Sequence, residues 1–112
     1  MQDDLVSEIG AKSALLDKAI QQLGVRGKAY AQAEHDYRVA LSKEILRARA
    51  DGIPVTIISD LCRGKPEIAR LRLEKDIAET VYDSAKEAIQ GYKLQIRILD
   101  AQLEREWGRS GG

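Results

Sequence analysis

The sequence predicts an all-α protein, a long antiparallel helical hairpin with a short helix at its turn. Charged residues make up 32% of the 112-residue chain, Phe is absent, and only two prolines occur. Such a composition is typical of long helices or coiled coils. Apolar residues recur in steps of three and four along both halves of the chain, which is the spacing of one helix face. The pattern stops once, in the midchain stretch ADGIPVTIISDLCRGKPE at 50–67, and this stretch predicts the turn.

The last helix is predicted over about 66–107. Pro66 suits a first helical turn, Glu67 complements the helix dipole, and Gly108 is expected to end the helix and begin a flexible tail at 108–112. From Leu71 onward, apolar or Tyr side chains alternate in steps of four and three, which is a heptad seam. The residues of this candidate core or oligomer seam are Leu71, Ala78, Tyr82, Ala85, Ile89, Tyr92, Ile96, Leu99 and Leu103.

The first helix is predicted over about 4–50, where the apolar stripe is looser. Gly52 can adopt a left-handed conformation after the helix, and Pro54 prevents its continuation. The residues of the stripe are Leu5, Ile9, Leu16, Ile20, Leu23, Gly27, Tyr30, Tyr37, Leu41, Ile45 and Ala48.

A short helix over about 57–63 is predicted between the two long ones, with Thr56 as its cap and Gly64 at its end. The chain is therefore one hairpin domain over 1–112. If the long helices run antiparallel about residue 58, Gly24 and Gly27 lie near Gly91. Two interpretations remain open: a close crossing of two backbones, or a flexible kink.

The last helix is apolar over more than its seam. One partner helix cannot cover so wide a face, and only a short helix remains in the chain to help. We therefore expect a homo-oligomer, in the first place a homodimer with a four-helix core. The additional apolar residues are Leu73, Ile77, Val81, Ala88, Leu94, Ile98 and Ala101.

Residues that carry chemistry are scarce. Cys62 has no His or second Cys near it in sequence, and His35 lies between two acidic residues, so we interpret them as a packed thiol and a solvated imidazole. No phosphate-binding loop, nucleophile motif or metal-ligand spacing occurs. The sequence therefore predicts a protein that is not an enzyme and has no cofactor and no metal.

The sequence also predicts where the protein is located in the cell. No apolar run approaches the roughly 20 residues of a membrane span, the acidic N-terminus does not resemble a signal peptide, and a single Cys agrees with a reducing compartment. We expect a cytoplasmic protein without a membrane partner. Its formal net charge is +0, so any binding to nucleic acid needs a local basic patch.

The turn end of the hairpin is mildly basic, because Lys and Arg outnumber Asp and Glu between residues 47 and 75. Apolar residues lie beside these charges, a mixture that suits contact with an acidic protein. A solvated charge asymmetry is the plainer interpretation, and a nucleic-acid or nucleotide site is the third. The candidate partner-binding tip comprises Arg47, Arg49, Ile53, Val55, Arg63, Lys65, Arg70 and Arg72.

Residues 38–107 resemble small helical proteins encoded by prophages and temperate phages of Gram-positive bacteria. The resemblance is carried by Gly-Ile-Pro-Val-Thr at 52–56, by Arg-Gly-Lys-Pro-Glu at 63–67 and by Lys-Leu-Gln-Ile-Arg-Ile-Leu at 93–99. It implies a phage origin and a place in the bacterial host cytoplasm. Small phage proteins of this kind often bind host factors, defence systems or replication machinery, which sets an expectation but assigns no residue.

These observations together predict a non-enzymatic, oligomeric interaction protein of a phage or prophage. It would bind a host or phage protein that the sequence does not identify, and it would inhibit a host process such as defence. The alternative is an accessory protein of phage replication, recombination or regulation that binds nucleic acid or a nucleotide.

Overall fold

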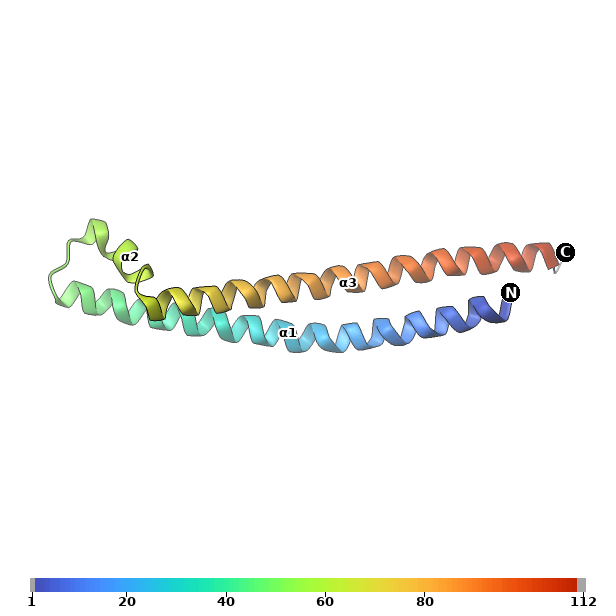
Figure 1. The fold of residues 1–112 in the computed structure, drawn as a ribbon, viewed down its shortest axis with the longest axis horizontal. Helices are drawn as coiled ribbons and strands as arrows, with labels where there is room; N and C mark the ends of the chain where they lie inside the picture. The colour runs from blue at the N-terminus through green and yellow to red at the C-terminus, as the bar shows by residue number, and fades with distance from the viewer. Residues whose placement is uncertain (1, 111–112) are drawn as a thin grey trace. The chain divides into compact units, whose positions relative to one another are not determined.

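The structure is a computed structural model that describes residues 2–110. It contains three helices in chain order, α1 (Gln2–Ala50), α2 (Val55–Arg63) and α3 (Pro66–Ser110), and no strand within the described residues (Figure 1). The predicted all-α hairpin, with two long helices and a short one at the turn, is therefore confirmed.

The chain forms two compact units, which we call the terminal unit and the turn unit. The terminal unit comprises Met1–Val25 and Asp83–Gly112, and the turn unit comprises Arg26–Tyr82. In each unit, a segment of α1 lies antiparallel beside a segment of α3, and the turn unit also contains α2 (Figure 1). Both units have thin cores, with Leu5, Ile89 and Leu99 buried in the terminal unit.

α1 ends in a glycine-dependent cap. Gly52 has a φ of +79°, as its predicted left-handed conformation requires. The amide of Ile53 donates to the carbonyl of Ala48 (3.1 Å), and the amide of Gly52 donates to the carbonyl of Arg49 (3.1 Å). This pair of hydrogen bonds is a Schellman motif, which satisfies the last carbonyls of the helix and reverses the chain.

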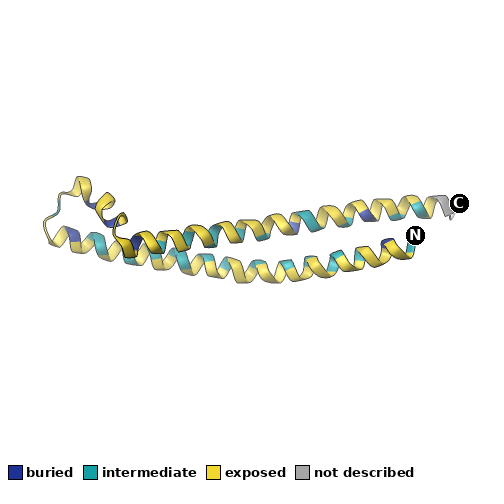
Figure 2. Cartoon of the chain, in the orientation of Figure 1, coloured by how far each residue is buried: buried dark blue, intermediate teal, exposed yellow. Residues whose placement is uncertain are grey.

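α2 packs on the last turns of α1 and forms the core of the turn. Ile58 and Cys62, one helical turn apart on α2, are buried against Ala48 of α1, and Ile45 and Ile53 pack on the same cluster. Figure 2 shows that α2 is otherwise mostly exposed. α2 occupies the last turns of α1. The start of α3 therefore lies beside an earlier turn of α1, where Glu44 contacts Lys65.

This placement of α2 sets the pairing of α1 with α3. Gly27 faces Tyr82, and Tyr82 also packs on Tyr30 with 6.0 Å between the ring centroids. Gly24 and Gly91 have no tertiary neighbour within 4 Å of their would-be Cβ atoms. The predicted crossing of Gly24 and Gly27 with Gly91 is therefore wrong, because it assumed a symmetric turn, and α1 is not interrupted at either glycine.

The helix ends differ from prediction in detail. α2 begins at Val55, with Pro54 as its N-cap and no capping side-chain hydrogen bond, so Thr56 lies inside the helix. Pro66 is the first residue of α3, as predicted. α3 continues through Gly108 to Ser110, because Gly is tolerated in a last helical turn, and the rest of the predicted tail, residues 111–112, lies outside the described residues.

The stripe predicted on α1 is wrong at one position. Ile20 is exposed, whereas Ala19 is half-buried and lies between the half-buried Leu16 and Leu23. Both residues fit a spacing of three and four, so periodicity alone could not separate them. The other ten residues of that stripe are buried or half-buried.

Candidate functional site

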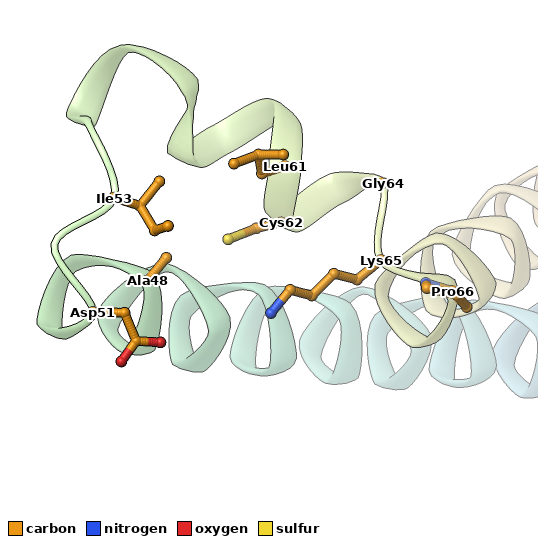
Figure 3. A pocket seen from close by; sticks show the side chains of 8 residues that line it. All are labelled: Ala48, Asp51, Ile53, Leu61, Cys62, Gly64, Lys65 and Pro66. Carbon is orange, nitrogen blue, oxygen red and sulfur yellow. The ribbon is translucent and has the colours of Figure 1, made fainter.

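The tip of the turn unit contains an open apolar pocket of about 420 Å³. Figure 3 shows Ile53 and Leu61 at its mouth and the thiol of Cys62 directed toward Ala48. Charged side chains lie at opposite ends of the pocket. Its lining residues are Ala48, Asp51, Ile53, Leu61, Cys62, Gly64, Lys65 and Pro66.

α2 exposes three large apolar side chains although it has only nine residues, and one of them, Leu61, lines the pocket. Val55, Ile57 and Leu61 are 75%, 45% and 51% exposed. Ile57 and Leu61 are one helical turn apart and therefore lie on one side of α2. We call Val55, Ile57 and Leu61, with the pocket, the tip surface.

A carboxylate on α1 holds the joint between α2 and α3. Glu44 accepts a hydrogen bond from Arg47 (2.6 Å) and another from Lys65 (2.5 Å), and its side chain is only 17% exposed. The hydrogen bond from Lys65 lowers the pKa of Glu44 below its ordinary value and raises the pKa of Lys65 in return. Two of the predicted tip cations are thus engaged in structural contacts.

The other predicted tip residues divide into three groups: paired cations, unpaired cations and apolar residues. Arg70 pairs with Glu67 and Glu74 on α3, which raises the pKa of Arg70, and Arg72 lies 4.0 Å from Asp76. Arg49 and Arg63 are exposed and form no ion pair with a described residue. Ile53 is half-buried in the tip core and Val55 is exposed.

All nine predicted seam residues of α3 are buried or half-buried. Ile89 and Leu99 are the most enclosed of them. Between Leu71 and Ala78, the seam has a polar residue, Lys75. Its ammonium nitrogen lies 5.8 Å from the centroid of the Tyr37 ring. The seam thus lies between α1 and α3 within each unit.

Grooves flank this seam in both units. The terminal unit has two, each of about 230 Å³, and the turn unit has one of about 290 Å³. Their linings repeat at heptad spacing on both helices. On α3 they include Ala78, Ala85, Tyr92 and Leu99, and on α1 they include Glu8, Leu15, Gln22 and Ala29. We call the helix faces that carry these residues the groove side.

The two flanks of the α3 seam differ in polarity. The groove side has Ile77, Val81, Ala88 and Ile98. The heptad positions on the opposite flank hold mostly charged residues, and ion pairs of Asp76 with Arg72 and Lys75 and of Asp83 with Lys86 lie among them. These flank residues are Arg72, Asp76, Glu79, Asp83, Lys86, Lys93, Arg97 and Asp100.

Conventional reactive centres are lacking in the described part of the chain. Cys62 is a free thiol that is 0% exposed, in agreement with a packing role. His35 is exposed and shares a hydrogen bond with Asp36 (3.3 Å), and Gln32 and His35 together lower the pKa of that carboxyl. Within residues 2–110, no group of three potential ligands could hold a metal, and no helix is long and apolar enough to cross a membrane.

Sequence reasoning missed Glu44 and the outward apolar residues of α2. Ile57 and Leu61 could have been found from their spacing with Ile58 and Cys62, since both pairs are four residues apart and only one pair can face α1. Glu44 gave no such signal, because its partner Lys65 is 21 residues away.

The chain matches no known family model, no curated protein and no solved structure at a significant level. Its function must therefore be argued from its own surfaces.

Proposed function

We propose that this protein is a non-enzymatic, phage-encoded interaction protein that binds another protein through the tip surface. The observation that carries the proposal is the open apolar pocket lined by Leu61, with the exposed Ile57 one helical turn away on the same side of α2. Apolar side chains gathered around a hollow favour binding of a partner's protruding apolar side chain. The phage origin rests on the resemblance of residues 38–107, and inhibition of a host process such as defence is the role that this origin suggests.

An acidic partner is the best match to the charges near the tip surface. Arg49 and Arg63 are exposed and have no carboxylate partner among the described residues, so they remain available to attract one. Such rim charges act mainly on the rate of association. Contact with a nucleic acid is the weaker alternative, because Arg47, Lys65, Arg70 and Arg72 already hold carboxylates in the turn unit.

The test compares proteins retained from a Gram-positive bacterial lysate by the immobilised wild type and by the double variant Ile57→Ser, Leu61→Ser. We expect at least one protein to be retained by the wild type and lost from the variant. Leu73→Ser is the matched control, since Leu73 is 59% exposed on α3 in the same unit but lies outside the tip surface. Equal retention by all three proteins would contradict the proposal.

The charge on the partner is tested with the retained protein itself. Replacing Arg49 and Arg63 by Gln should slow association several-fold and flatten its dependence on salt, while dissociation changes little. The matched control is Arg70→Gln, because Arg70 is already paired with Glu67 and Glu74. An unchanged salt dependence in the double variant would argue against an acidic partner.

A further inference from the structure

The exposed area of the chain leaves room for a large interface. The chain exposes 8028 Å², whereas the scaling of surface with mass gives about 6,100 Å² for a compact monomer of this size. The excess of about 1,900 Å² exceeds the roughly 800 Å² that each partner buries in a standard interface. A second chain could thus cover a full interface and still leave more surface exposed than a compact monomer has.

The groove side has the spacing that a copy of the same chain requires. Its lining residues recur at heptad intervals on both α1 and α3, and heptads keep two supercoiled helices in contact over many turns. Small and large side chains occur together on this side, for example Ala85 and Ala88 beside Leu15 in the terminal unit. The face thus has both hollows and protrusions, which a self-complementary two-fold interface requires.

The charged flank of α3, opposite the groove side, indicates which side of the seam can bind a second copy. Its charged residues form ion pairs with one another, Asp76 with Arg72 and Lys75, and Asp83 with Lys86. Burial of these paired charges would cost desolvation energy. On the groove side, α3 contributes one charged lining residue, Glu74, among mostly apolar ones, and the other charged lining residues, Glu8, Lys12, Lys18 and Arg26, belong to α1. On α3, the groove side is therefore the flank better suited to a helical partner.

We infer that a second copy of this chain covers the groove side, so that the protein is a homodimer in which α1 and α3 of both copies form a four-helix coiled coil. The interface is independent of the tip surface, which belongs to α2 and the turn. The exposed Ile77 and Val81 in the turn unit and Ile98 in the terminal unit become buried between the copies.

The test is the mass in solution of the full chain and of two matched isoleucine variants, measured by sedimentation equilibrium over a range of micromolar concentrations. Ile98 lines a groove and is 55% exposed, whereas Ile20 is 49% exposed on α1 in the same unit and lines none of the grooves described. The wild type should have twice the chain mass of 12.4 kDa. Ile98→Lys should raise the dissociation constant of the dimer at least about 100-fold, because it replaces an apolar side chain of the interface with a longer, charged one.

Ile20→Lys should change the dissociation constant by no more than about threefold, as expected for a surface substitution. Circular dichroism checks that both variants retain the helical content of the wild type. A wild type with the mass of one chain, or of more than two, would overturn the inference. Equal effects of the two substitutions on the dissociation constant would overturn it as well.

Discussion

Glu44 shows how one side chain connects three helices of the turn unit. It extends from α1 to Lys65, at the joint of α2 and α3, and it also holds Arg47 one turn further along α1. The predicted basic tip is therefore smaller than the sequence indicated, because part of its positive charge is neutralised by this carboxylate. The remaining cations near the tip surface are Arg49 and Arg63.

The pairs of Glu44 predict how stability depends on pH. The folded-state pKa of Glu44 lies below its ordinary value of 4.5, so its contribution to stability is fully present above that value and is lost as pH falls through the lower, folded-state pKa. Glu44→Gln should lower the melting temperature at pH 7. The difference from the wild type should shrink as the pH is taken below the folded-state pKa, which thermal unfolding followed by circular dichroism would measure.

The matched control for this experiment is Glu34→Gln. Glu34 pairs with Arg38 on the surface of α1 alone and joins no other element, so its replacement should change the melting temperature less. A difference between the wild type and Glu44→Gln that stays constant from pH 7 to strongly acid conditions would contradict the role assigned to the Glu44 carboxylate.

At the scale of the helices, replacing Gly by Ala should change the free energy of unfolding differently at three positions. Gly24→Ala should raise the free energy of unfolding by about 1 kcal/mol, because Ala favours the helix and a Cβ atom there meets no neighbour within 4 Å. Gly27→Ala should raise the free energy of unfolding by less, since the Cβ atom of the new alanine would lie 3.1 Å from Cε1 of Tyr82. Gly52→Ala should lower the free energy of unfolding by about 1 to 2 kcal/mol, because its φ is positive.

Urea unfolding of the three alanine variants tests this order. The gain at Gly24 depends on α1 alone, the smaller gain at Gly27 depends on its packing with α3, and the loss at Gly52 depends on the cap that reverses the chain. If Gly27→Ala stabilised the protein more than Gly24→Ala did, the pairing of Gly27 with Tyr82 would be wrong.

For the whole molecule, the seam is the main source of stability, and a charge placed in it should unfold the hairpin. Leu99→Asp should lower the free energy of unfolding by about 3 kcal/mol or more, because Leu99 is 9% exposed and the substitution replaces its buried apolar side chain with a carboxylate. Leu94→Asp is the control. Leu94 is 51% exposed on the same helix, and its replacement should cost about 0.5 kcal/mol or less. Equal melting curves for both variants would contradict the seam.

The candidate site could be predicted only in part. Composition located the tip, and Val55, Arg49 and Arg63 are exposed there as a partner-binding surface requires. The ion pair of Lys65 with Glu44 could not be predicted, since it depends on which turn of α1 faces the start of α3, whereas Arg47 and Glu44 form a local pair three residues apart on α1. The spacing of α2 shows two apolar pairs, but only the packing of Ile58 and Cys62 on Ala48 decides that Ile57 and Leu61 face outward and forms the pocket.

The sequence by itself determined the three helices, their seams and the position of the turn. These features are local, because a repeat of three and four residues, a Gly in the left-handed region and a Pro at a first helical turn act within a few residues of chain. The structure confirms them, from the φ of Gly52 to Pro66 at the start of α3, except that Ile20 of the predicted α1 stripe is exposed.

Only the tertiary structure decided the register of α1 against α3 and the side on which the grooves lie. A heptad pattern looks the same after a shift of seven residues, so it cannot specify which turns of two helices meet. That choice depends on α2, which covers the last turns of α1 through Ile58 and Cys62. As a result, the start of α3 lies beside Glu44. Gly27 consequently meets Tyr82, and one groove of the terminal unit forms where Ala19 of α1 lies near Ala85 and Ala88 of α3.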